Sequence, residues 1–600
     1  MIKNILEGEH CMQNNISQIQ KQYLQLHDSV CGYNQEELFC DSLVKELQNI
    51  FDTIPSDRNI AIRAYGDVSK WIIDKIDFFE KKCVICDKDT NKPAYKGIKV
   101  YHYSDLVLNK DRYFFVNVSF NYRREIVFDF EKDQVMYIDI YRELEKRDIH
   151  LNTAPVFYRQ SSHAIPNFFW RQYKKERNEQ SLKKYVAALI EAYDFAGLEV
   201  LLNKENTQWL KRVEHEYEKL KILIKEALKN RVKKYNDILL FWIDAVPHKW
   251  KKNLPFINSL SDSTLSFENV YAMTPFTHQT FKAMFDRQKP LEDYKKSVKL
   301  LGNHNCELIE YLETKNYSFI QFGDDGCRYV TCEPEYLENM DEYVTCNYIY
   351  WTAMMRMLEN NSPCFYILHS AIETHPPMVS PELNDYNVYI SSDDYYKQAE
   401  ISYAYFDRSF RYYFELLEGY TCILMSDHGE HISNKKEKFW SQNKIHTWMM
   451  ISDDKLKPKK EYRLFSYLKF IDLIKYLFQD AGYDSLFSEI VTIQDIDFYY
   501  EDTVKRLIQT KEEERFIAYR AAFDGTYKFA INRGGQKFYY KVNDDVDIPI
   551  SSDNLPSAFD ALEKEAGNYF PQIWDCEKYK YCKDLYKGYL MHKKEREGNV

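Results

Sequence analysis

Two short apolar runs in this chain each end at an acidic side chain. Residues 238–243 read Ile-Leu-Leu-Phe-Trp-Ile and are followed by Asp244, while residues 422–426 read Cys-Ile-Leu-Met-Ser and are followed by Asp427 and His428. Continuous apolar runs of this length are typical of strands that are buried on both faces of a parallel sheet. We therefore predict an α/β fold in which a mostly parallel central sheet is flanked by helices.

The acids at the ends of these strands are candidates for metal binding. Ligand sites gather at the carboxyl ends of strands in open α/β sheets. A carboxylate beside a long apolar run is costly to bury unless it is paired or coordinates a metal ion. Asp and His supply the oxygen and nitrogen donors that suit Zn²⁺ or Mn²⁺. For residues 426–430 (Ser-Asp-His-Gly-Glu) taken alone, an ordinary loop is the alternative.

A threonine-rich turn between the two runs offers a nucleophile. Residues 269–285 have the pattern of a strand, a turn and a helix that begins at about Thr277. A hydroxyl at a helix N-terminus is either an N-cap or a nucleophile whose alkoxide is favoured by the helix dipole and by a metal ion. Thr277 is the candidate nucleophile, and Thr274 and Thr280 are the alternatives.

In their order along the chain, these segments resemble the alkaline phosphatase superfamily. Within it they are similar to the sulfatase-like branch that includes phosphoethanolamine transferases and lipoteichoic acid synthases. The resemblance spans about residues 235–545, and only the "S-D-H-G-E" signature is individually specific. Its further pieces are the strand end at Asp244, the "T-x-x-S"-like turn Thr277-His-Gln-Thr280, the "H-x-P"-like Thr374-His375-Pro-Pro, and the segments 396–407, 470–478 and 520–529.

The resemblance implies a set of ligands and a covalent mechanism. A single divalent ion, Zn²⁺ or Mn²⁺, is expected, with a second ion left open. Thr277 would attack phosphorus and form a phospho-threonine, while His375 and His446 contact phosphoryl oxygens or protonate the leaving group. The expected metal ligands are Asp244, Asp427, His428 and the oxygen of Thr277. His369 is interpreted as an orienting or core histidine rather than a ligand.

The expected activity is transfer of a phosphoryl-type group, of the phosphoethanolamine or phosphoglycerol kind, in the modification of a surface glycan. A phosphorylated small molecule or lipid would be the donor, and a glycan or sugar nucleotide the acceptor. A phosphodiesterase or phosphatase, and a non-catalytic scaffold that binds a phosphorylated ligand, stay as alternatives. Sulfate-ester hydrolysis is disfavoured because the turn at Thr277 lacks the "C-x-P-x-R" frame in which sulfatases form their nucleophile.

The N-terminal part of the chain has a β-α-β-β cadence from residue 59 onward. Over about residues 58–150 it resembles the small Rossmann-like domains found beside sugar-modifying enzymes. Of the glycines in a dinucleotide fingerprint only Gly66 is present, and Asp87 stands where a ribose-binding acid would lie. A nucleotide site at Gly66 and Asp87 is therefore one interpretation, and a structural or docking role is the other.

The expected domain organisation follows from these segments. It comprises a helical segment (1–57), a Rossmann-like domain (58–160), a helical connector (161–234), a metal-dependent catalytic domain (235–500) and a C-terminal subdomain that completes it (501–600).

The charge and hydropathy of the sequence bear on the binding partners and the cellular location of the protein. Lys and Arg number 81 against 92 Asp and Glu, and the resulting net charge of −11 argues against a general nucleic-acid binder. The apolar runs are shorter than the roughly 18–20 residues of a membrane helix. The 13 cysteines, an odd number, suit reduced thiols. We expect a cytoplasmic protein, with peripheral association at the inner membrane face and the oligomeric state left open.

Overall fold

The structure is a computed structural model, and it divides the chain into two compact units. Unit 1 comprises Met1–Arg231, Met340–Asn360 and Ile372–Glu418, and unit 2 comprises Val232–Asn339, Asn361–Ala371 and Gly419–Val600. The residues that the structure describes are 16–30, 34–78, 82–87, 90–119, 123–149, 151, 162–205, 207–293, 306–323, 337–339, 344–374, 392–429, 440–495, 519–532, 535–543 and 545–570.

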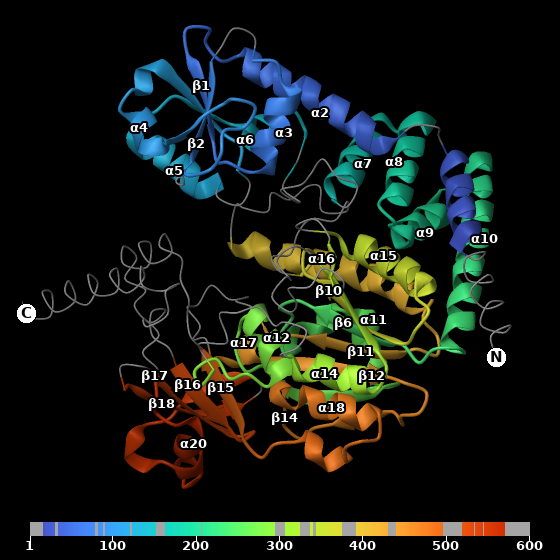
Figure 1. Ribbon diagram of the computed structural model, residues 1–600, viewed down its shortest axis with the longest axis vertical. Coiled ribbons are helices and arrows are strands. Elements are labelled where there is room, and N and C mark those ends of the chain that lie inside the picture. The colour runs from blue at the N-terminus through green and yellow to red at the C-terminus, as the bar shows by residue number, and fades with distance from the viewer. Residues whose placement is uncertain are drawn as a thin grey trace, which may run out of the picture. The chain divides into compact units, whose positions relative to one another are not determined.

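Unit 1 contains a five-stranded sheet in which all neighbouring strands are parallel (Figure 1). The strand order β3-β2-β1-β4-β5, with a helix after β1, β3 and β4, confirms the predicted Rossmann-like α/β architecture. The strands are β1 (Asn59–Arg63), β2 (Cys83–Asp87), β3 (Val100–His102), β4 (Tyr113–Asn117) and β5 (Tyr137–Asp139), and the helices are α3 (Asp67–Lys75), α4 (Tyr103–Val107), α5 (Arg123–Asp133) and α6 (Ile140–Glu145).

Most of the other described residues of unit 1 are helical. The helix α2 begins after Asn34, whose side chain accepts a hydrogen bond from the Glu37 N–H at 3.2 Å, and its apolar face buries Phe39, Leu43 and Leu47. The helices are α2 (Gln35–Asp52), α7 (Ala164–Glu176), α8 (Glu179–Glu191), α9 (Phe195–Lys204), α10 (Gln208–Val232), α15 (Cys346–Glu359) and α16 (Ser392–Phe414).

Unit 2 is built on a nine-stranded sheet with the order β13-β7-β12-β11-β6-β10-β8-β9, in which β14 also pairs with β7. Only β12 runs opposite to the other described strands of this sheet. The strands are β6 (Ile238–Ile243), β7 (Leu265–Tyr271), β8 (Ser318–Gly323), β9 (Leu337–Asn339), β10 (Cys364–Ser370), β11 (Thr421–Ser426), β12 (His446–Ser452), β13 (Lys459–Glu461) and β14 (Phe465–Ser466).

The core of unit 2 explains why the two apolar runs of the sequence are strands. All six residues of β6 are buried, and alternate ones, such as Leu240 and Trp242, pack with side chains of three helices on one face. The predicted α/β fold with a mostly parallel sheet flanked by helices is therefore confirmed. These helices are α12 (Thr277–Asp286), α14 (Glu307–Thr314) and α18 (Phe470–Leu477); the shorter α11 (Pro255–Leu260) and α17 (Gln442–Ile445) connect strands.

A second sheet in unit 2 is an antiparallel meander with the order β15-β16-β17-β18-β19. The helix α20 packs on it through Phe559 and Leu562. Among the described helices of the chain, none combines the length and apolar character needed to cross a membrane. The elements are β15 (Val491–Asp495), β16 (Tyr519–Phe523), β17 (Tyr527–Asn532), β18 (Lys537–Asn543), β19 (Val546–Pro549) and α20 (Ala558–Ala566).

Candidate active site

Two neighbouring parallel strands bring the predicted metal ligands together. The strands β6 and β11 pair in parallel, with Ile243 opposite Ser426, so the residues that follow them lie at the same edge of the sheet. Asp244 comes directly after β6, and Asp427 and His428 come directly after β11. All three side chains are buried, and their donor atoms lie within 4.8 Å of one another.

The carboxylate of Asp427 is held by backbone on one side only. Its Oδ1 accepts hydrogen bonds from the N–H groups of Ala245 at 3.0 Å and His428 at 2.8 Å. Its buried Oδ2 has no hydrogen-bond partner among the described residues. Burial raises the pKa of Asp427, and the nearby carboxylate of Asp244 raises it further. A bound cation would stabilise the ionised form of this pair.

A backbone carbonyl contacts the ring of His428 and fixes its tautomer. Its Nδ1 lies 2.8 Å from the carbonyl oxygen of Gly429, which can only accept a hydrogen bond, so Nδ1 carries the proton. The lone pair is then on Nε2, which lies 3.5 Å from Oδ2 of Asp427 and 3.8 Å from Oδ1 of Asp244. Two carboxylates and an imidazole lone pair therefore converge, which is a donor set that fits a divalent metal ion.

Thr277 places a hydroxyl beside this donor set. Its Oγ1 lies 3.1 Å from Nε2 of His428 and 3.4 Å from Oδ2 of Asp244. Thr277 is the first residue of α12 and the N-cap is Phe276, so the hydroxyl is not the cap of the helix. Its side chain is half-buried, which leaves it accessible to a substrate.

The alternative nucleophiles have other contacts. The hydroxyl of Thr274 is 3.0 Å from the side-chain oxygen of Gln279, and the hydroxyl of Thr280 donates to the backbone carbonyl of Thr274 at 3.2 Å. Both threonines are fully buried. The geometry therefore favours Thr277 over Thr274 and Thr280.

His369 positions Asp244 from the neighbouring strand. It lies in β10, and its Nε2 is 3.2 Å from Oδ2 of Asp244. Its ring packs edge-on against Trp242 and Phe281, which fixes its orientation. This placement agrees with the interpretation of His369 as an orienting histidine.

Gly429 is a structural requirement of the site that sequence reasoning did not single out. A Cβ at this position would lie 1.8 Å from the backbone oxygen of Asn443, which no relaxation of a side chain can relieve. Its N–H donates to the carbonyl of Lys444 at 2.8 Å. The signal for it was the glycine inside the "S-D-H-G-E" string, because a glycine is needed where two backbone segments approach closely.

Of the two predicted catalytic histidines, only His446 is among the described residues. His375 lies outside the described residues. His446 begins β12, and its ring nitrogens contact Asp545 at 2.5 Å and the carbonyl of Glu268 at 2.9 Å. Its predicted role in phosphoryl chemistry therefore stays a prediction.

The predicted nucleotide-binding residues lie in unit 1. Gly66 is the N-cap of α3, and a Cβ there would meet nothing within 4 Å. Asp87 ends β2; its Oδ2 accepts from the N–H of Tyr65 at 2.7 Å, and its Oδ1 lies 3.3 Å from Nζ of Lys92. Oδ2 thus holds the turn after β1, and a nucleotide role for Gly66 and Asp87 stays a prediction.

Comparisons with known proteins return fold likeness only. No family model and no curated protein matches the chain. Similar solved structures include a protein in the alkaline phosphatase superfamily from Vibrio parahaemolyticus, at 10% identity and a TM-score of 0.40, covering 61% of this chain and 96% of that one. A phosphonate monoester hydrolase of Agrobacterium radiobacter matches at 10% identity and a TM-score of 0.37, covering 60% and 96%. A 2-O GAG sulfatase matches at 10% identity and a TM-score of 0.38, covering 60% and 92%. Likeness at this level assigns neither a family nor a substrate to this chain.

Proposed function

We propose that this chain is a metal-dependent enzyme that transfers a phosphoryl-type group through a covalent intermediate on Thr277. The observation that carries the proposal is the convergence of the Thr277 hydroxyl, the Nε2 lone pair of His428 and the carboxylates of Asp244 and Asp427. A nucleophilic hydroxyl beside a set of metal donors is the arrangement that such chemistry requires.

The residues fit a divalent ion, Zn²⁺ or Mn²⁺. Asp244, Asp427 and His428 would hold it, and it would supply the positive charge that lowers the pKa of the threonine hydroxyl and stabilises charge on a phosphoryl oxygen. The chain's own contribution is to fix the donors: backbone N–H groups hold Asp427, His369 holds Asp244, and the carbonyl of Gly429 holds His428.

The reaction divides into two displacements at phosphorus. In the first, a bond forms between Oγ1 of Thr277 and phosphorus while the bond to the donor's leaving oxygen breaks. The hydroxyl proton is released to solvent, and the leaving oxygen takes a proton from water. In the second, an acceptor hydroxyl attacks phosphorus, the bond to Thr277 breaks, and the proton of the acceptor is released as Thr277 is reprotonated.

The nature of the acceptor separates a transferase from a hydrolase. We propose an alcohol acceptor on a glycan or sugar nucleotide, and a phosphoethanolamine- or phosphoglycerol-type donor on a small molecule or lipid. Water as the acceptor would make the same site a phosphodiesterase or phosphatase. Adding an alcohol such as glycerol to a chromogenic phosphodiester assay tests this: a transferase diverts phosphorus into the alcohol ester, whereas a hydrolase releases it as the free acid.

The nucleophile is tested by removing only its hydroxyl. Thr277→Val should lower kcat/KM on a chromogenic phosphodiester with Mn²⁺ or Zn²⁺ by at least about 100-fold, because the displacement loses its attacking oxygen. Thr277→Ser keeps a hydroxyl at the same place and serves as the matched control. Wild-type turnover by Thr277→Val would refute the assignment.

A further inference from the structure

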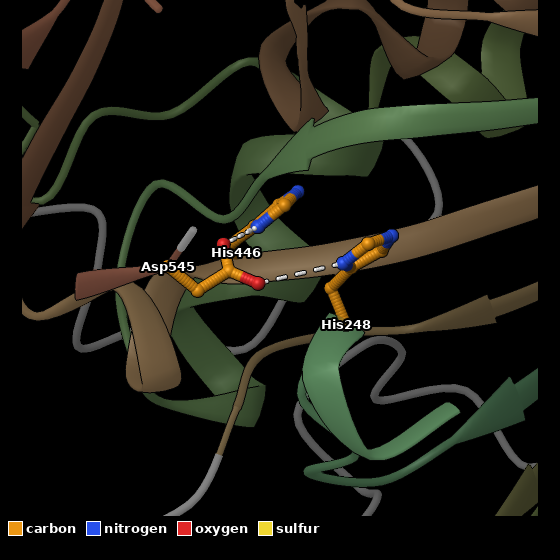
Figure 2. A group of neighbouring side chains, drawn as sticks. All are labelled: His248, His446 and Asp545. Carbon is orange, nitrogen blue, oxygen red and sulfur yellow. Dashed lines mark hydrogen bonds and ion pairs between the residues drawn. The ribbon is translucent and has the colours of Figure 1, made fainter. Parts of the chain in front are cut away.

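A second group of metal-type donors lies in unit 2, away from the contacts of Thr277. Figure 2 shows that the carboxylate of Asp545 contacts both His248 and His446. His248 begins the short 3-10 helix His248–Asn253, His446 begins β12, and Asp545 lies in the turn between β18 and β19. The donor atoms of the three residues lie within 4.8 Å of one another.

Both ring nitrogens of His446 face hydrogen-bond acceptors. In the neutral ring, one of these nitrogens has no proton to donate. Its Nε2 lies 2.9 Å from the carbonyl oxygen of Glu268, and its Nδ1 lies 2.5 Å from Oδ1 of Asp545. A carbonyl and an ionised carboxylate can only accept hydrogen bonds. A neutral imidazole has one N–H. One nitrogen lone pair of neutral His446 therefore points at an oxygen lone pair, unless a cation lies between these two atoms.

His248 repeats this arrangement. Its Nε2 is 3.2 Å from Oε2 of Glu268, and its Nδ1 is 3.6 Å from Oδ2 of Asp545. The two imidazole rings are stacked, with centroids 4.3 Å apart. Protonating both rings would therefore set two positive charges face to face. One divalent cation bound by both neutral rings would avoid this repulsion.

We propose that His248, His446 and Asp545 bind a Zn²⁺-class divalent cation through the two Nδ1 atoms and the carboxylate. Two imidazoles and one carboxylate are borderline donors that suit Zn²⁺ better than Mg²⁺ or Ca²⁺. Glu268 completes the arrangement, because its side chain and its carbonyl each hold one Nε2–H and so direct both Nδ1 lone pairs inward.

The cluster has an access path for the ion. His248, Glu268 and Asp545 line a cavity of about 420 Å³, and the lysines 249, 251, 252 and 460 line it as well. Three protein ligands leave a fourth position for water or an anion. Because the lysines are positively charged, the molecule at this position would be a small anion such as phosphate or a carboxylate.

Metal counting tests the site and does not depend on the proposed function. The chain is dialysed against buffered Zn²⁺ and its zinc measured by mass spectrometry, with His102→Gln, an exposed histidine in unit 1, as the matched control. Wild type and the control should bind two zinc ions, one at each donor set. His248→Gln and Asp545→Asn should each bind one, and Asp427→Asn should bind one because it removes a ligand of the other set.

The outcomes separate the two donor sets. If Asp427→Asn keeps the wild-type zinc content while His248→Gln loses one ion, the candidate active site fails and the second site stands. Unchanged zinc content in both His248→Gln and Asp545→Asn would overturn the second site. X-ray absorption on zinc-loaded Asp427→Asn checks the second site with all of its ligands intact. We expect two imidazole ligands per zinc ion. A spectrum with no imidazole ligand would overturn the proposal.

Discussion

At the scale of single residues, the candidate active site depends on backbone contacts that fix ring and carboxylate orientation. The carbonyl of Gly429 sets the proton of His428 on Nδ1, and the N–H of Ala245 holds one oxygen of Asp427. Ala245 has a φ of +55°, a left-handed conformation that a non-glycine residue adopts at some cost. These contacts leave Nε2 of His428 facing both Oγ1 of Thr277 and Oδ2 of Asp427.

Substituting Gly429 tests this dependence. Gly429→Ala places a Cβ 1.8 Å from the backbone oxygen of Asn443, so the segment after β11 must shift. We expect a loss of about 2 kcal/mol or more in the free energy of unfolding, measured by urea denaturation, and a weaker affinity for Zn²⁺. Gly482→Ala is the control because a Cβ there meets nothing within 4 Å. Equal stability of the two variants would contradict the packing argument.

The residues of the candidate active site were predictable where strands fix their position. Asp244, Asp427 and His428 follow apolar runs, and Thr277 opens a helix, so the α/β pattern alone brings them to one edge. The partnership of His446 with His248 and Asp545 was not predictable. Asp545 is 99 residues from His446 and lies in a turn. In a turn, no periodic sequence pattern indicates which residues are close in space.

At the scale of elements, the helix that carries Thr277 is anchored at its other end. Arg287 follows α12, and its guanidinium donates two hydrogen bonds to Asp472 of α18, at 2.7 and 3.1 Å. Burial alone would raise the pKa of Asp472, but Arg287 more than offsets this and the pKa is lowered. The pair links α12 to α18 on one face of the sheet.

The pH dependence of this pair gives a prediction. The pKa of Asp472 is lower in the folded state than in the unfolded state, where it is near 4. Its ionised carboxylate therefore stabilises the folded state at pH values above about 4. This contribution is lost as the pH falls through the folded-state pKa. Asp472→Asn should therefore lower the free energy of unfolding by about 1 kcal/mol at pH 7, with the difference shrinking toward pH 3.

Chemical denaturation at both pH values checks this. Asp560→Asn, an exposed acid in the first turn of α20, is the control and should change little at either pH. A deficit of Asp472→Asn that is equally large at pH 3 and pH 7 would show that the charge of Asp472 is not the cause.

The sequence pattern predicted the central strands better than the grouping of the helices. Apolar runs gave β6, β10 and β11 because strands buried on both faces have few polar residues. The helices α15 and α16 belong to unit 1 although neighbouring strands in the chain belong to unit 2. Such a grouping depends on long-range packing, which local periodicity does not encode.

At the scale of the whole molecule, metal removal should destabilise unit 2. A ligand that binds only the folded state adds about 2.7 kcal/mol per site at a free concentration of 100 times its Kd. Removing Zn²⁺ with a chelator should therefore lower the Tm of the wild-type chain. His248→Gln and Asp427→Asn should each show a smaller drop on chelation, since each has one donor set left.

Calorimetry with and without the chelator measures these drops. A Tm that does not respond to chelation in the zinc-loaded wild type would contradict both metal sites. Equal drops in wild type and His248→Gln would contradict the His248–His446–Asp545 site alone.

The covalent step on Thr277 is the central claim, and trapping the intermediate tests it most directly. Zinc- or manganese-loaded chain is mixed with a chromogenic phosphodiester, quenched with acid during turnover and mapped by peptide mass spectrometry. We expect the mass of the transferred group on Thr277, and its absence in Thr277→Val. Turnover with no adduct on the chain, or with the adduct on Thr274, Thr280 or a histidine, would contradict it.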